Sequence, residues 1–184
     1  MGAVYGIHGE ADLGEVRRMG ARLAHRGQQQ AVWSVTPRVH LGTRACLGAA
    51  AQPSGLPIAF AGFFDYRPEL LELVGAEGDR AAAERVTDAE LFLAVYRRHG
   101  LDGLGLIRGQ FAAALWDAAW QRLLLVCDPL ATQLLYVAQA GGRYAFATEY
   151  KALWPSTTSR PGPTATRSST CSAPSSRSPT ARCC

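Results

Sequence analysis

The sequence predicts a layered α+β domain followed by a tail of different composition. Residues 1–155 contain many short apolar segments bounded by turn residues, which is typical of strands. Only two or three segments show helical spacing. Hydrophobic residues make up 48% of the 184 residues, which is enough for one core. Many strands joined by short turns favour a layered α+β arrangement over a doubly wound sheet.

The first part of the domain is expected to hold four strands and one helix. Residues 3–7 form a short apolar run that predicts the first strand. A helix is expected next, because apolar residues follow at helical spacing: Leu13, Val16, Met19 and Leu23. Residues 31–36 and 39–47 are expected to be strands around Pro37, and residues 57–64 a further strand that ends before Pro68.

The second part is expected to open with a helix and to continue as strands. Thr87 followed by Glu90 forms a capping box, and His99-Gly100 is a typical helix end. Four strands are expected after it, at residues 111–116, 123–127, 134–138 and 144–148. Gly141-Gly142 predicts a turn between the last two strands.

Residues 156–184 are predicted to be a disordered tail. They consist of Ser, Thr, Pro, Arg, Cys and Ala with one Gly, and contain no acidic, aromatic, Leu, Ile or Val residue. Such a segment cannot bury enough apolar surface to offset the entropy of ordering it. The domain is therefore expected to comprise residues 1–155.

Charge and cysteine content argue against several functions. The 15 acidic residues all precede residue 156, and Lys151 with fourteen arginines balances them, so residues 1–155 carry no net charge. No nucleic-acid-binding face is expected on this part. No apolar run approaches the roughly 18 residues that a membrane span needs. The five cysteines show no disulfide framework, so a reduced, cytoplasmic location is expected.

The remaining polar residues give weak signals. The four histidines show no pairing with a cysteine or an acid at ligand spacing, so no metal site is expected. Asp117 and Asp128 could suggest a carboxylate pair. Turn or strand-end roles are favoured, because Asp117 precedes a turn and Asp128 precedes Pro129.

Ten short segments of residues 1–155 occur in a characteristic order. They are Tyr5-Gly6-Ile7-His8-Gly9, His25-Arg26-Gly27, Leu41-Gly42-Thr43-Arg44, Gln52-Pro53, Phe60-Ala61-Gly62 with Tyr66 to Leu70, Thr87-Asp88-Ala89-Glu90, Arg108-Gly109-Gln110-Phe111-Ala112, Trp116-Asp117, Cys127-Asp128-Pro129-Leu130 through Leu135-Tyr136, and Glu149-Tyr150-Lys151-Ala152-Leu153. Together they resemble the N-terminal glutaminase domain of the asparagine synthetase family, a class II glutamine amidotransferase. The resemblance implies a four-layer αββα sandwich of two antiparallel sheets, the fold of N-terminal-nucleophile (Ntn) hydrolases.

The family's chemistry makes demands that this sequence does not meet. In the family, a cysteine exposed by removal of the initiator Met attacks the glutamine carboxamide, and its own α-amine is the base. The family pattern Cys-Gly-Ile-x-Gly falls on residues 5–9, so Tyr5 is expected at the nucleophile's place, while removal of Met1 would expose Gly2. A phenol with a pKa of about 10 has no thiolate character. No catalytic residue is expected, and hydrolysis of glutamine is predicted to be lost.

Other residues of the glutamine pocket are altered as well. The family's Asn-Gly-Glu falls on Ala61-Gly62-Phe63, which removes the oxyanion side-chain donor and one carboxylate. The arginine that holds the substrate carboxylate falls on Ala45 or, with a one-residue slip, on Arg44. Vestigial glutamine-binding residues are thus expected to be Arg44, Gly62 and Asp88. Asp88 also has a structural interpretation, since a carboxylate is favoured in the first turn of a helix.

In the family this domain precedes a larger synthetase domain that uses ATP and magnesium. Nothing in residues 156–184 resembles it, so this chain is expected to bind no cofactor and to have a synthetase domain or subunit as its partner. The segment from Thr164 onward can be back-translated into DNA with permitted codons and then read in the frame one base earlier. One such choice of codons gives a peptide that resembles the family's linker into the synthetase domain. A frame change near Trp154-Pro155 is therefore favoured over a genuine disordered tail.

Three functions remain open at the level of sequence. The first is a degenerate amidotransferase domain of an asparagine-synthetase-like amide ligase. The β-lactam synthetases and lasso-peptide cyclases of the family resemble this case, because their ligases use an amine already present in the substrate. The second is a fragment of an active glutamine-hydrolysing asparagine synthase, which Tyr5, Ala61 and Phe63 disfavour. The third is a non-catalytic scaffold that docks on a separate synthetase subunit.

Overall fold

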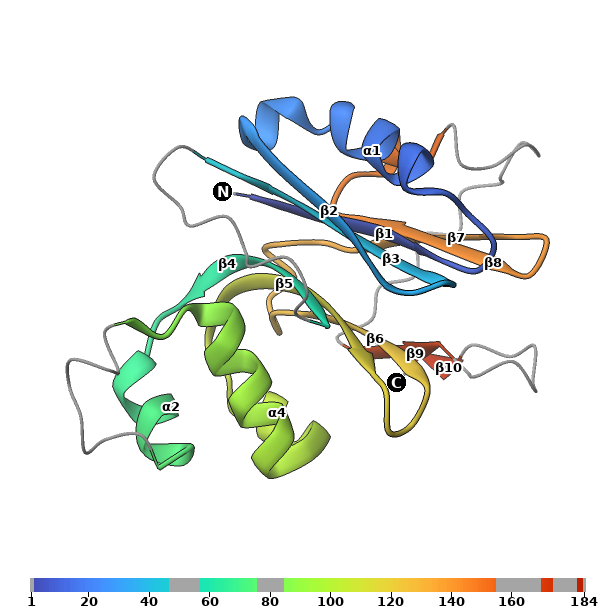
Figure 1. The fold of residues 1–184 in the computed structure, drawn as a ribbon. Coiled ribbons are helices and arrows are strands. Elements are labelled where there is room, and N and C mark those ends of the chain that lie inside the picture. Colours follow the sequence, from blue (N-terminus) through green and yellow to red (C-terminus); the bar gives the residue numbers. More distant parts are fainter. Residues whose placement is uncertain (1, 47–56, 76–84, 155–169, 174–181, 184) are drawn as a thin grey trace.

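Two antiparallel sheets stack face to face, and helices cover their outer faces (Figure 1). The computed structural model describes residues 2–46, 57–75, 85–154, 170–173 and 182–183. Each sheet has five strands, with the order β2-β3-β1-β8-β7 in sheet A and β10-β9-β6-β5-β4 in sheet B. The layers run α1, sheet A, sheet B, α4, which confirms the expected αββα sandwich.

Sheet A is built around the first strand. Its strands are β1 (Ala3–His8), β2 (Gln29–Thr36), β3 (Val39–Ala45), β7 (Tyr136–Ala140) and β8 (Arg143–Ala147). β1 pairs with β3 on one side and with β8 on the other. Side chains of β1 alternate between the two faces. Tyr5 and Ile7 therefore pack in the core toward α1, whereas Val4 packs between the sheets.

Sheet B carries four alanines, together with Trp116, Leu123 and Leu125, on the face that meets sheet A. Its strands are β4 (Ile58–Phe64), β5 (Gly109–Asp117), β6 (Arg122–Cys127), β9 (Thr170–Ala173) and β10 (Arg182–Cys183). Between the sheets the core includes four alanines of β4 and β5, namely Ala59, Ala61, Ala112 and Ala114. The other face of sheet B packs its larger residues, Ile58, Phe60, Phe111 and Leu115, against α4.

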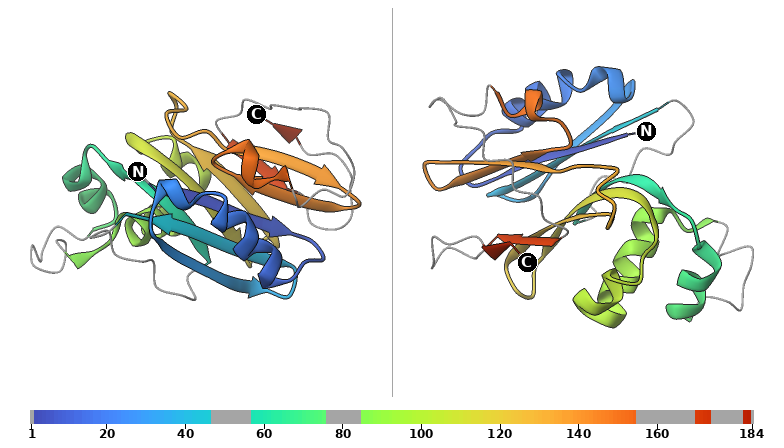
Figure 2. Two further views of the ribbon diagram at one scale, coloured as in Figure 1. Left: turned by 90° about the horizontal axis from the view of Figure 1, so that it is seen from above. Right: turned by 180° about the vertical axis from the view of Figure 1, so that it is seen from behind.

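Helix α1 (Leu13–Ala21) covers sheet A and begins where the sequence predicts. Asp12 caps it, with its carboxylate accepting a hydrogen bond from the Glu15 amide at 2.6 Å. A short 3-10 helix η1 (Ala24–Arg26) follows, and a second one, η2 (Tyr150–Ala152), lies beside α1 on the same face (Figure 2). Segments far apart in the chain therefore meet on the outer face of sheet A.

Helix α4 (Asp88–Leu104) covers sheet B together with α2 (Arg67–Leu73). The capping box of Thr87 and Glu90 is present as expected. The first helical segment ends at Gly100 as expected, because this glycine takes a non-helical φ of 63°, and a second, short helical segment of α4 follows the kink. Helix α2 was not predicted, since Pro68 signals a strand boundary and is equally suited to the first turn of a helix.

Part of the expected disordered tail is described as strand. Thr170–Ala173 pairs with Leu123–Val126 of β6, and Arg182–Cys183 pairs with β9. The rest of the tail lies outside the described residues, and so does Pro155. The expected frame change near Trp154-Pro155 therefore falls at the edge of the described part of the chain. Strand pairing uses backbone groups, so a sequence without apolar periodicity can still extend a sheet edge.

Candidate functional site

Gly2, Arg44 and Ala61 lie together at the end of the sandwich where β1 begins. A Cβ atom placed on Gly2 would lie 3.3 Å from Cβ of Ala61 and 2.5 Å from the backbone oxygen of Arg44. The antiparallel register that pairs Ala3 with Arg44 brings the ends of β1 and β3 together at this point. Gly2 and Ala61 therefore face each other, and neither has a side chain that could attack or polarise a carboxamide.

Tyr5, to which the resemblance assigns the nucleophile's position, lies away from Gly2 and Ala61. Its side chain is fully buried beneath α1, where its hydroxyl donates to the backbone oxygen of Thr43 at 3.4 Å. A Cβ on Gly20 would come within 2.2 Å of the Tyr5 hydroxyl oxygen, and one on Gly42 within 2.3 Å of its ring. Burial raises the pKa of Tyr5 to about 12, so the phenol stays protonated. Residues 2 and 5 are three positions apart and face opposite sides of the strand.

Arg44 is buried and donates four hydrogen bonds within the protein. Its side chain points toward α1 and η1, where Nε donates to the Gly20 oxygen at 2.9 Å. Nη1 donates to the oxygens of Gly27 and Gln28, and Nη2 donates to Oε1 of Gln30 at 3.0 Å. These acceptors are neutral oxygens. The guanidinium thus ties the segment after α1 to β2 and β3.

The other two expected glutamine-binding residues are also used structurally. Asp88 lies in the first turn of α4 and forms an ion pair with Arg67, which also donates to the backbone oxygen of Val86. This favours the helix-terminus interpretation of Asp88. Gly62 has a φ of 139°, and a Cβ there would lie 2.1 Å from the Gln110 oxygen, so the glycine permits the close approach of β4 and β5.

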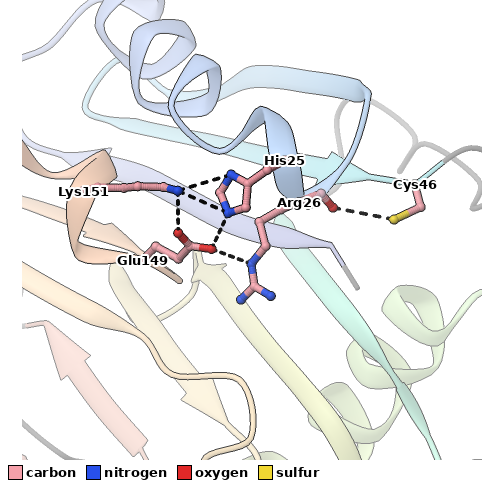
Figure 3. Close-up of polar contacts among 5 residues, drawn as sticks. All are labelled: His25, Arg26, Cys46, Glu149 and Lys151. Atoms are coloured by element: carbon pink, nitrogen blue, oxygen red, sulfur yellow. Dashed lines mark hydrogen bonds and ion pairs between the residues drawn. The ribbon is translucent and has the colours of Figure 1, made fainter.

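A polar cluster lies at the same end of sheet A (Figure 3). The Glu149 carboxylate accepts from Nε2 of His25 at 2.8 Å, and it forms ion pairs with Nε of Arg26 at 2.8 Å and with Nζ of Lys151 at 3.0 Å. Nζ of Lys151 also lies 3.3 Å from Nδ1 of His25, so a neutral imidazole can accept there. Cys46 donates its thiol to the backbone oxygen of Arg26 at 3.6 Å. The cluster joins η1 to η2.

The electrostatics of the cluster favour an ionised carboxylate. Burial raises the pKa of Glu149, but the hydrogen bonds and charges of His25 and Lys151 lower it further, and the net pKa lies below the usual value. The sequence signals for this cluster are the segments His25-Arg26-Gly27 and Glu149-Tyr150-Lys151. They are more than one hundred positions apart, so the sequence does not reveal that they touch.

Asp117 and Asp128 hold turns, as the sequence favours. Asp117 accepts from the amides of Ala119 and Trp120. Asp128 accepts from the amides of Phe111, Thr132 and Gln133. Burial raises its pKa, but these hydrogen bonds lower it further, and the net pKa lies below the usual value.

Among the described residues, no group of three or more His, Cys, Asp or Glu side chains could hold a metal ion. No helix in the described ranges is both long and apolar enough to cross a bilayer.

Comparison with known sequences identifies related proteins. A family model described as a glutamine amidotransferase domain matches residues 1–170. A putative glutamine-hydrolysing asparagine synthetase of Mycobacterium tuberculosis (strain H37Rv) is 39% identical over 66 residues, which are 36% of this chain and 10% of that protein. Amidase chyE of Penicillium rubens is 37% identical over 65 residues, 35% of this chain and 10% of that protein. The match thus spans about a tenth of the length of these curated relatives.

Comparison with solved structures supports the fold. The glutamine phosphoribosylpyrophosphate amidotransferase of B. subtilis, complexed with ADP and GMP, superposes with a TM-score of 0.64 and 17% identity, over 82% of this chain and 42% of that one. A structure described as the allosteric regulatory enzyme of purine biosynthesis gives a TM-score of 0.66 with the same identity and coverage. At this level of identity the likeness concerns the fold alone.

Proposed function

This chain belongs to the glutamine amidotransferase domain family, and we propose on that basis that it is a degenerate glutaminase domain of an asparagine-synthetase-like amide ligase. It is related to the N-terminal domains of asparagine synthetases. In this proposal the domain no longer releases ammonia from glutamine. The ATP- and magnesium-dependent ligase chemistry belongs to a synthetase domain or subunit outside residues 1–155.

The observation that carries the proposal is Gly2 beside Ala61. We assign the place of the family's nucleophile to Gly2, because it precedes β1 and faces Ala61, which takes the place of the oxyanion asparagine. Glycine offers no nucleophile and alanine no hydrogen-bond donor. Loss of one oxyanion donor costs a factor of about 10²–10³ in rate, and loss of the nucleophile removes the covalent route altogether.

The substrate-binding residues support the same conclusion. Arg44 directs its guanidinium at four oxygens of the protein, and Asp88 is paired with Arg67. A glutamine molecule would have to displace these internal partners in order to use either charge. The backbone amide of Gly62 by itself is not sufficient to recognise an amino acid.

The proposal is tested by ammonia release from glutamine, with an active amidotransferase assayed in parallel. We expect no release above the blank from the full chain. An electrophilic glutamine analogue should leave no adduct on the N-terminal residue. Exposed Cys46 could react non-specifically, so a Cys46→Ser variant is measured beside the parent. Ammonia release by both proteins would overturn the proposal and favour a fragment of an active glutamine-hydrolysing asparagine synthase.

A further inference from the structure

A local excess of positive charge lies on the outer face of sheet A, although residues 1–155 have no net charge. Residues 17–27 contain four arginines and one histidine and no acidic residue. Two of these arginines, Arg22 and Arg26, reach η2: Arg22 donates to the backbone oxygen of Lys151 at 3.4 Å, and Arg26 pairs with Glu149. Charges from two distant segments are thus concentrated on one surface.

Two large exposed aromatic residues, Tyr150 and Trp154, flank Lys151 in the chain. Tyr150, the first residue of η2, is 69% exposed and its ring contacts that of Tyr136, while Trp154, which follows η2, is 64% exposed. We call the surface formed by Arg22, His25, Arg26, Tyr150, Lys151 and Trp154 the η2 face. Trp, Tyr and Arg are the residue types that contribute most to protein–protein binding. Exposed aromatic groups next to arginines are therefore typical of an interface.

The η2 face is held in a defined conformation before any partner binds. Ala152 and Leu153 are buried against Val16, Met19 and Leu23, which fixes η2 on α1. Pairing with Glu149 restrains the side chains of His25, Arg26 and Lys151 (Figure 3). Side chains that are already ordered lose less entropy on binding. The charges are thus presented at low entropic cost.

The charge balance indicates the chemistry of the partner. Among the described residues, Glu149 is the one carboxylate that contacts these cations, so Arg22, Arg26 and Lys151 leave a formal excess of two positive charges. A polyphosphate is disfavoured, because residues 1–155 have no net charge to attract it and the Glu149 carboxylate lies at the centre of the face. A polypeptide with a few carboxylates and apolar side chains is complementary to this pattern.

We propose that the η2 face docks an acidic, partly apolar segment of a separate ATP-dependent ligase subunit. The proposal rests on the proposed function only for the identity of that subunit. The chemistry of the segment follows from the face itself: carboxylates pair with Arg22 and Lys151, and an apolar side chain packs on Tyr150 and Trp154.

The experiment measures binding of the full chain to a fluorescein-labelled peptide of alternating glutamate and leucine by fluorescence anisotropy. We expect saturable binding that weakens as salt is raised. The double variant Arg22→Glu/Lys151→Glu should weaken it by more than about tenfold. Trp154→Ala leaves every ion pair intact and should also weaken binding. The matched control is Arg97→Glu. Arg97 is an exposed residue of α4, which lies in the layer on the other side of the molecule, so this variant should bind the peptide as the parent does.

Three outcomes would overturn the proposal. They are an absence of peptide binding to the parent, an equal loss in Arg97→Glu, and binding of a double-stranded DNA oligonucleotide more tightly than the peptide through the same residues. Circular dichroism checks that each variant is folded. Peptide binding that depends on the η2 face would support the proposal even if the ammonia assay showed glutaminase activity, so the two proposals fail separately.

Discussion

Replacing Arg44 by methionine should destabilise the domain severely. Arg44 is 9% exposed, and its guanidinium donates four hydrogen bonds, to Gly20, Gly27, Gln28 and Gln30. Each hydrogen bond contributes about 1 kcal/mol net, and removal of a charged donor leaves buried acceptors unsatisfied, so the expected loss is about 3–5 kcal/mol in unfolding free energy. Methionine keeps much of the side-chain volume, which limits the contribution of a cavity.

Urea unfolding followed by circular dichroism measures this loss. Arg97→Met is the control, because Arg97 is exposed on α4, and it should change the unfolding free energy by less than about 0.5 kcal/mol. Arg44→Lys keeps the charge but not the fork of donors, so it should fall between the parent and Arg44→Met.

A small effect of Arg44→Met on stability would contradict this prediction. If Arg44 were kept available for a substrate carboxylate, Arg44→Met would cost less than about 1 kcal/mol. Glutamine would then raise the melting temperature of the parent, and Arg44→Met would abolish that rise. Observation of both effects would refute the assignment of Arg44 to a structural role.

Three further outcomes are expected from unfolding measurements. Burial and the charge of Arg38 lower the pKa of His8 from 6.5, so the folded state binds fewer protons and stability should fall as the pH drops below about 6.5; His8→Phe should show a smaller fall in a urea titration at several pH values. The lowered pKa of Asp128 implies stability that is present above about pH 4 and lost as the pH falls through the folded-state value, and Asp128→Asn should remove part of this acid-dependent loss. Thr87→Ala should lower the melting temperature through the loss of about 1 kcal/mol of helix capping, whereas Thr87→Ser should retain the cap with Glu90.

The order and nature of most elements follow from local sequence patterns. The Thr87–Glu90 capping box and the Gly141-Gly142 turn mark boundaries that the structure confirms. Helix α2 was missed, because Pro68 is compatible with both a strand boundary and a helix start. The strand β7 begins at Tyr136 and not at residue 134, within the usual uncertainty of strand ends. Backbone preference and apolar periodicity act over a few residues, so the sequence carries these features directly.

By itself the sequence determined that this domain carries an amidotransferase pattern without the cysteine and the asparagine of that chemistry. The tertiary structure decided which residue faces Ala61. A shift of three positions along β1 reverses the direction of a side chain, so Gly2 lies there and Tyr5 lies beneath α1. It also decided that Arg44 bonds to backbone oxygens and that Glu149 gathers His25, Arg26 and Lys151. These contacts depend on strand register and on the packing of η1 against η2, which join parts of the chain that no local pattern connects.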